Sequence, residues 1–271
     1  MTDRPPASKP SVRTPAGLPD GVGPATIGVR GGLLRSEFEE TAEALYLTSG
    51  YVYESAADAE RAFAGEIDRF VYSRYGNPTI AMFEERLRLI EGAPACFATA
   101  TGMAAVFTAL GALLGAGDRL VAARSLFGSC FVVCNEILPR WGVQTVFVDG
   151  DDLGQCERAL SEPTTAVVFE TPSNPVQSLV DIAAVTELAH AAGAKVVLDN
   201  VFATPLLQQG FQLGVDVVVY SGTKHIDGQG RVLGGAILGD TDYIDGPVQK
   251  LMRHTGPAIS AFNAWIMLKG L

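Results

Sequence analysis

A short apolar run that stops abruptly at small polar residues constrains this chain more than any other feature. The segment is Val217–Gly230, with the sequence VVVYSGTKHIDGQG. An apolar, β-branched run predicts a buried strand, and the Ser/Gly/Thr cluster ends it. Lys224 therefore follows the carboxyl end of a strand, which is where open α/β sheets bind their ligands.

A second strand is expected to end in the same way. Residues 196–200, VVLDN, place the carboxylate of Asp199 at the end of another buried run. A lysine that condenses with an aldehyde, hydroxyls that hold a phosphate and a carboxylate that pairs with a pyridinium nitrogen are what pyridoxal phosphate requires of a protein. Alone, each residue is more often a surface lysine or a strand-capping aspartate. Together they favour the cofactor site.

The other lysines are poorer candidates for attaching a cofactor. The chain has five: Lys9, Lys195, Lys224, Lys250 and Lys269. Lys9 lies in a Pro-rich segment and Lys195 opens a strand at the end away from the site. The last two lie in helix-like segments, where long basic side chains usually reach solvent. Only Lys224 directly follows a buried strand.

Composition indicates a globular α/β protein and argues against several partners. Of the 271 residues 48% are hydrophobic, and the net charge is −10. An acidic chain without a basic block is a poor partner for nucleic acid or an anionic membrane. Its four cysteines form no C-x-x-C pair, which favours buried free thiols in a reducing, cytoplasmic compartment. The uncharged stretch from Gly92 to Gly117 is better explained by a strand, a turn and a buried helix than by a membrane span.

The order of the expected elements predicts the domain organisation. Residues 1–25 resemble a disordered tail, residues 26–65 an N-terminal arm and residues 66–271 one large cofactor-binding domain. In the arm we expect an extended segment at 45–53 and a helix at 56–65. Strands are expected at 96–98, 119–122, 144–148, 166–170, 195–198, 215–220 and 235–238, and helices at 79–91, 103–114, 130–141, 181–192, 243–254 and 260–269. This alternation predicts a mostly parallel sheet with helices on both faces.

Three further polar groups could contribute to a site. In residues 98–103, ATATGM, Gly102 lets the backbone approach a ligand and the following helix could hold a phosphate, although a plain turn is the alternative. In residues 170–175, ETPSNP, two prolines hold Asn174 rigidly, unless it only forms an Asx turn. In residues 72–79, YSRYGNPT, Arg74 suits a phosphate but could be an ordinary loop arginine. No phosphate-loop or G-x-G-x-x-G motif supports a nucleotide-dependent enzyme.

Together these segments resemble the Cys/Met-metabolism family of pyridoxal-phosphate enzymes. The motifs YSRYGNPT, ATGMAA, ETPSNP, LDNVFATP and YSGTKHIDGQGRVLGG occur in the order and spacing of the family, from about Tyr46 to the last residue. The resemblance implies the type I transferase fold of the aspartate aminotransferase kind. It also implies a C-terminal small domain, which this chain stops short of and which carries the arginine for the substrate carboxylate.

The resemblance implies a role for each matched residue. Lys224 would attach the cofactor and then move protons, while Asp199 would pair with the pyridinium nitrogen. Phe127 would stack on the ring, where most of the family has a tyrosine, and Asn174 would face the cofactor hydroxyl and the substrate. The remaining cofactor contacts would come from Gly102, Met103, Thr204, Ser221 and Thr223, and from Tyr72 and Arg74 reaching the phosphate of a neighbouring subunit. No metal is implied.

Within the family, residues 227–231, DGQGR, look most like the O-succinylhomoserine sulfhydrylase branch. This similarity implies replacement of the succinyl-oxy group by sulfide, giving homocysteine for methionine biosynthesis. A homotetramer built from dimers that share active sites is the corresponding assembly. Because Phe127 cannot move a proton, a lyase activity is less favoured. Cystathionine γ-synthase, O-acetylhomoserine sulfhydrylase and a catalytically silent cofactor-binding fragment remain as alternatives.

Overall fold

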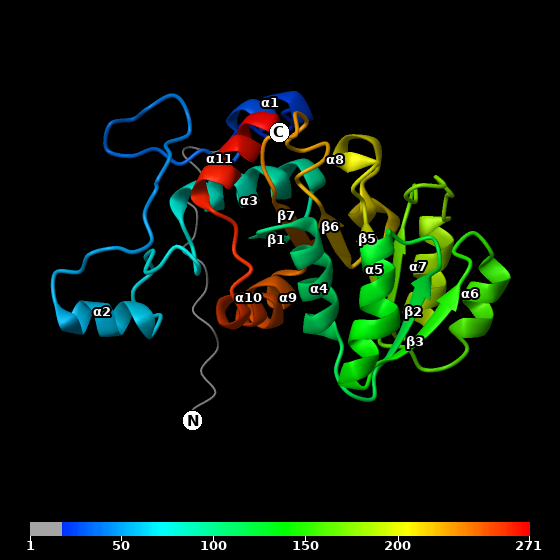
Figure 1. Cartoon of the computed structure of the whole chain (residues 1–271). Coiled ribbons are helices and arrows are strands. Elements are labelled where there is room, and N and C mark those ends of the chain that lie inside the picture. Colours follow the sequence, from blue (N-terminus) through cyan, green and yellow to red (C-terminus); the bar gives the residue numbers. More distant parts are fainter. Residues whose placement is uncertain (1–17) are drawn as a thin grey trace.

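One seven-stranded sheet organises the protein, as seen in the computed structural model, which describes residues 18–271 (Figure 1). The strands are β1 (Ala95–Thr99), β2 (Arg119–Ala123), β3 (Gln144–Val148), β4 (Ala166–Glu170), β5 (Lys195–Asp199), β6 (Val217–Tyr220) and β7 (Gly235–Gly239). Their order across the sheet is β1-β7-β6-β5-β4-β2-β3. The neighbouring strands from β6 through β5, β4 and β2 to β3 all pair in parallel. The prediction of a mostly parallel sheet is confirmed.

Strand β7 is the exception, since it pairs antiparallel with both β1 and β6. A parallel connection needs a crossover, usually a helix, between the two strands. The segment between β6 and β7 contains turns but no helix, so the chain reverses direction there. This segment carries Lys224.

The helices lie at or near the predicted positions, with three additions. They are α1 (Pro24–Arg30), α2 (Ala56–Phe63), α3 (Pro78–Glu91), α4 (Gly102–Leu113), α5 (Gly128–Val132), α6 (Leu153–Ala159), α7 (Ile182–Ala191), α8 (Thr204–Leu207), α9 (Thr241–Tyr243), α10 (Gln249–Thr255) and α11 (Ala261–Gly270). A π-helical turn and a 3₁₀ turn extend α5 to Trp141, and a π-helical turn joins α9 to α10. The predicted helices at 130–141 and 243–254 are therefore each one helical segment with changes of pitch. Helices α1, α6 and α8 were not expected.

Local capping explains where the helices that frame the site begin. Asn77 accepts hydrogen bonds from the backbone N–H groups of Thr79 and Ile80, and Pro78 occupies the first turn of α3. That helix ends at Gly92, whose φ of 72° suits glycine. Thr101 caps α4 in the same way, because its hydroxyl accepts from the N–H of Ala104.

The sheet separates two apolar cores. In β4, Val167 and Phe169 belong to the core under α3, α6, α7 and α11, whereas Ala166 and Val168 belong to the core under α4, α5 and α10. Because both faces are covered, the strands consist of continuous apolar residues, which made them predictable. The four cysteines are free and buried within these cores, as expected.

A buried ion pair fastens the N-terminal arm to the domain. The Arg86 side chain, in α3, is 2% exposed and donates to the Glu43 carboxylate at 2.6 Å. It also donates to the carbonyl oxygens of Gly31 and Leu268, so that the arm, α3 and α11 meet at one guanidinium. Residues 45–53 form no regular strand, and Gly50 makes an isolated antiparallel bridge with Tyr72. The predicted tail lies mostly outside the described residues, and α1 begins at its end.

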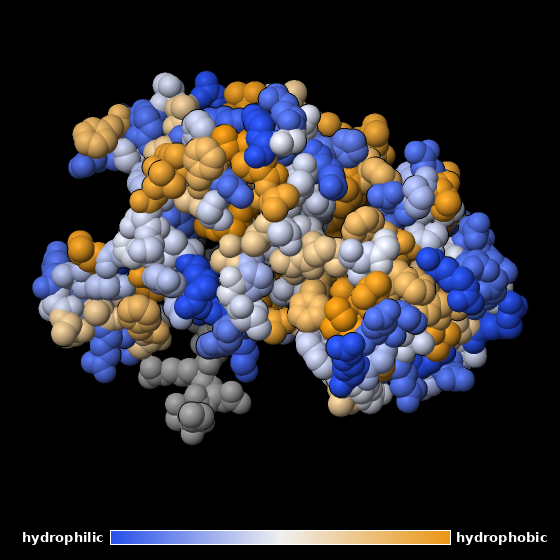
Figure 2. All heavy atoms as spheres, in the orientation of Figure 1, coloured by the Kyte–Doolittle hydropathy of each residue, from blue (hydrophilic) through white to orange (hydrophobic). Residues whose placement is uncertain are grey.

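The surface is mixed in character. Figure 2 shows hydrophobic side chains gathered over α11, where Phe262 is 47% exposed. Among residues 18–271, no helix combines the length and the apolar character that a membrane crossing requires.

Candidate functional site

Most of the predicted site residues converge on one pocket at the carboxyl ends of the central strands. Its volume is about 260 Å³. The predicted residues that line it are Gly102, Met103, Phe127, Asn174, Asp199, Ser221, Thr223 and Lys224. They lie at or just after the ends of separate strands, and the sheet topology brings them together.

One end of the pocket is suited to an anion. The N–H groups that begin an α-helix have no carbonyl acceptor within it, and α4 begins at Gly102, beside Ser221 in the segment that follows β6. A Cβ at Gly102 would lie 2.5 Å from the Cβ of Ser221, so only glycine permits this approach. Thr223 is held nearby, since its hydroxyl accepts the N–H of Gly234 at 3.1 Å.

The pocket also holds a buried carboxylate. Asp199 is 8% exposed and accepts one described hydrogen bond, from the N–H of Val201 at 3.1 Å. Burial, and then the nearby Glu170, raise the pKa of Asp199 to about 7. No ion pair involves Asp199 among residues 18–271. A cationic N–H group would therefore relieve the cost of burying this charge.

Lys224 lines the same pocket. Its backbone N–H donates to the Ser221 carbonyl at 3.2 Å and its carbonyl accepts from Gly228 at 2.8 Å, which fixes the turn after β6. The ammonium group has no side-chain partner in the described part of the chain. Downstream, the buried Asp227 carboxylate accepts from Arg231 Nε at 2.8 Å and secures the next loop.

Phe127 is hydrogen-bonded to a pocket residue that was not predicted, Glu170. Phe127 lies at the amino end of α5, is 43% exposed and donates its N–H to Glu170 Oε2 at 2.7 Å. Glu170 lines the pocket and ends β4 in register with Asp199. The signal was present in the ETPSNP motif, where a carboxylate ends a buried strand. Cys130, Phe202 and Leu233 also line the pocket and were not expected.

Three predicted residues do not line this pocket. The Arg74 guanidinium lies 5.2 Å from the ring centre of Tyr72 and 5.0 Å from that of Tyr75, and it donates to the Arg253 carbonyl. Thr204 begins α8 with a φ of 60°, and its hydroxyl accepts from the N–H of Leu206 at 3.3 Å. The roles of Tyr72, Arg74 and Thr204 remain predictions from the resemblance.

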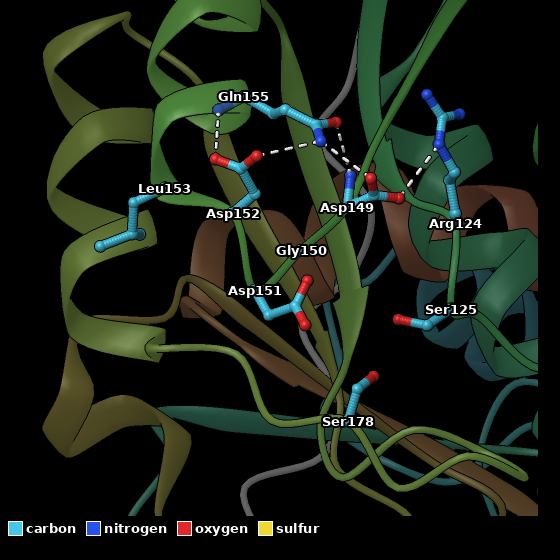
Figure 3. A pocket seen from close by; sticks show the side chains of 9 residues that line it. All are labelled: Arg124, Ser125, Asp149, Gly150, Asp151, Asp152, Leu153, Gln155 and Ser178. Carbon is cyan, nitrogen blue, oxygen red and sulfur yellow. Dashed lines mark hydrogen bonds and ion pairs between the residues drawn. The ribbon is translucent and has the colours of Figure 1, made fainter.

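A second, more open hollow lies beyond β3 and contains none of the predicted residues (Figure 3). Its aspartates largely have partners already. Asp149 pairs with Arg124 at 3.2 Å, and the amide of Gln155 donates to Asp149 and Asp152 (Figure 3). Because Asp152 also caps α6, these acidic groups are explained by the start of that helix.

The donor set of the first pocket fits pyridoxal phosphate. The helix start and hydroxyls at one end suit a phosphate dianion, and the uncompensated carboxylate of Asp199 suits a protonated ring nitrogen. Lys224, which lines the same pocket, is the amine that could bind an aldehyde.

Comparisons with known proteins agree with this chemistry. The family model described as Cys/Met metabolism PLP-dependent enzyme matches residues 25–271. O-succinylhomoserine sulfhydrylase of Mycobacterium tuberculosis H37Rv is 87% identical over 261 residues, which are 96% of this chain and 64% of the relative. O-succinylhomoserine sulfhydrylase of Pseudomonas aeruginosa is 46% identical over 246 residues, covering 91% of this chain and 61% of the relative.

A solved structure from Campylobacter jejuni, which contains N′-pyridoxyl-lysine-5′-monophosphate, is 28% identical with a TM-score of 0.86 and covers 92% of this chain and 70% of that one. The predicted transferase fold is thereby confirmed. The chain spans less than two thirds of the length of the two curated relatives. Across the part that it does span, the chain belongs to the Cys/Met-metabolism family of pyridoxal-phosphate-dependent enzymes.

Proposed function

We propose that this chain is the cofactor-binding part of an O-succinylhomoserine sulfhydrylase. The reaction replaces the succinyl-oxy group of O-succinylhomoserine with sulfide and gives homocysteine. The observation that carries the proposal is the meeting of Lys224, Asp199 and the amino end of α4 in one pocket. The identity of 87% to a curated sulfhydrylase supports the choice of substrate.

Each residue of the pocket would have its own role in binding the cofactor or moving a proton. Gly102, Ser221 and Thr223 would anchor the phosphate, and Asp199 would keep the proton on the ring nitrogen. When bound, pyridoxal phosphate supplies an electron sink that stabilises negative charge at the substrate Cα. Lys224 would hold the cofactor and then carry the Cα proton, because it is the lysine that lines the pocket.

The sulfur that is transferred must come from outside the pocket. Cys130 is the cysteine that lines it, and burial raises the pKa of this thiol well above its usual range. A neutral thiol is a poor nucleophile, so Cys130 does not compete with added sulfide. Phe127 has no proton to give, so it does not share the proton transfers that we assign to Lys224.

The assembly is part of the same proposal. Tyr72 is 39% exposed, and no carboxylate pairs with Arg74 among the described residues. An arginine with free donors suits the phosphate of a neighbouring subunit, in a homotetramer of active-site-sharing dimers. The buried free thiols support a cytoplasmic location.

The test offers O-succinylhomoserine with sulfide and cysteine together and identifies the product. Homocysteine supports the proposal, whereas cystathionine identifies a cystathionine γ-synthase. A higher kcat/KM for O-acetylhomoserine would indicate the acetyl-specific enzyme. Bound cofactor without any turnover would indicate a silent fragment. Lys224→Ala is expected to lower turnover by at least about a thousandfold, since it removes both the attachment point and the proton carrier.

A further inference from the structure

A buried glutamate with no role in the scheme above lies between the aromatic wall of the pocket and Asp199. Glu170 ends β4 and is in register with Asp199 on the neighbouring strand β5. Only 4% of Glu170 is exposed, and it lines the same pocket. No ion pair with Glu170 occurs within residues 18–271. The reason for a carboxylate at this position must therefore come from its hydrogen bonds.

The carboxylate connects two loops that form separate walls of the pocket. Its Oε2 accepts the N–H of Phe127, which follows β2, at 2.7 Å. Burial raises the pKa of Glu170, and backbone hydrogen bonds from Phe127 and Asn174 partly oppose that shift. Because Phe127 follows β2 and Glu170 ends β4, the hydrogen bond between them joins the loop that carries the aromatic residue to the strand that leads to Asn174.

Stability alone is a weak explanation for this arrangement. A carboxylate held by N–H groups and without a cation pays a large desolvation cost, whereas an apolar residue of similar size would fill the space at less cost. We propose that Glu170 is a positioning residue, which holds the backbone of Phe127 in the place from which its ring would contact the cofactor. This inference rests on the proposed cofactor site.

Glu170→Gln tests the proposal because it keeps the size of the side chain. The amide has one acceptor oxygen where the carboxylate has two, so the Phe127 N–H either meets an opposing NH₂ group or donates to a neutral oxygen, which is a weaker acceptor than a carboxylate. The substitution also removes a negative charge beside Asp199. The loss of this charge changes the affinity for the cofactor independently of the position of Phe127. A double-mutant cycle with Phe127→Ala removes this second effect, since the charge is lost in both backgrounds.

The first measurement is the Kd for pyridoxal phosphate of the chain and of the Glu170→Gln, Phe127→Ala and double variants. Glu170→Gln is expected to weaken binding roughly tenfold more in the presence of Phe127 than in its absence. Visible circular dichroism of the bound cofactor should change in Glu170→Gln, because the stacking residue has moved. Independent, multiplicative effects of the two substitutions would overturn the proposal.

The second measurement needs no cofactor. Hydrogen exchange at the Phe127 amide should be roughly tenfold faster in Glu170→Ala, which removes the acceptor, than in the parent chain. Glu157→Gln, on the exposed side of α6, is the control and should leave this rate unchanged. Equal exchange rates of the Phe127 amide in Glu170→Ala and the parent would show that Glu170 does not restrain Phe127. If the parent chain binds no pyridoxal phosphate, the proposed function fails, and the exchange rate still decides the role of Glu170.

Discussion

The free energy of unfolding is expected to fall less with rising pH in Glu91→Gln than in the parent chain. Glu91 ends α3 and is 1% exposed. Its carboxylate accepts from the Tyr220 hydroxyl at 2.5 Å and from the Gly210 N–H at 3.3 Å. Asn200 completes the network by donating to the Tyr220 oxygen at 2.6 Å. The network therefore joins α3 to the ends of β5 and β6, directly behind the pocket.

The size of the effect follows from the pKa. Burial raises the pKa of Glu91 from 4.5 to about 7. The folded state thus keeps a proton at pH values where the unfolded chain has lost it, and the stability from this proton disappears as the pH rises through about 7. From about pH 5.5 to about pH 8.0, linkage gives a loss of about 2 kcal/mol in the free energy of unfolding.

Glu91→Gln imitates the protonated carboxyl and has no such proton to lose. Urea unfolding at the two pH values should show a decrease about 2 kcal/mol smaller in the variant than in the parent chain. Asp199, whose pKa is also raised, contributes equally to both proteins and cancels. Exposed Glu157→Gln serves as the control and should keep the parent's pH dependence. An identical pH dependence in Glu91→Gln and the parent would refute the reasoning.

Two further substitutions test the phosphate end of the pocket and the anchoring of the arm. Gly102→Ala should weaken the binding of pyridoxal phosphate at least about tenfold in an absorbance titration, because the added Cβ would lie 2.5 Å from the Cβ of Ser221. Gly111→Ala in the same helix meets its nearest atom at 3.4 Å and should bind normally. Glu43→Ala leaves the Arg86 guanidinium buried without its carboxylate and should lower the free energy of unfolding by about 3–5 kcal/mol in urea. The exposed Glu37→Ala is its control, and an equally small loss in both variants would contradict the role of this ion pair.

The strands and the two ends of the pocket could be predicted because each depends on local sequence. Strands buried on both faces are apolar runs, and Asp199 and Lys224 follow their own runs directly. Helix α6 was missed because it is short and its start is defined by the cap at Asp152. The direction of β7 depends on the path of the preceding segment rather than on its own residues.

Residues whose roles depend on distant partners were harder to find. Glu170 matters through the N–H of Phe127, which lies on another loop, and Glu91 matters through Tyr220 on β6. Neither partnership has a spacing that a sequence pattern could reveal. By contrast, Gly102 was predicted to allow a close approach by a ligand, and the structure shows that it also allows the close approach of Ser221.

Borohydride reduction of the purified chain incubated with pyridoxal phosphate, followed by peptide mass spectrometry, tests the central claim most directly. The claim is that this pocket binds the cofactor through Lys224. A reduced pyridoxyl group on Lys224, with none on Lys9, Lys195, Lys250 or Lys269, is the predicted result. Labelling spread over the other lysines, or no labelling at Lys224, would contradict the account.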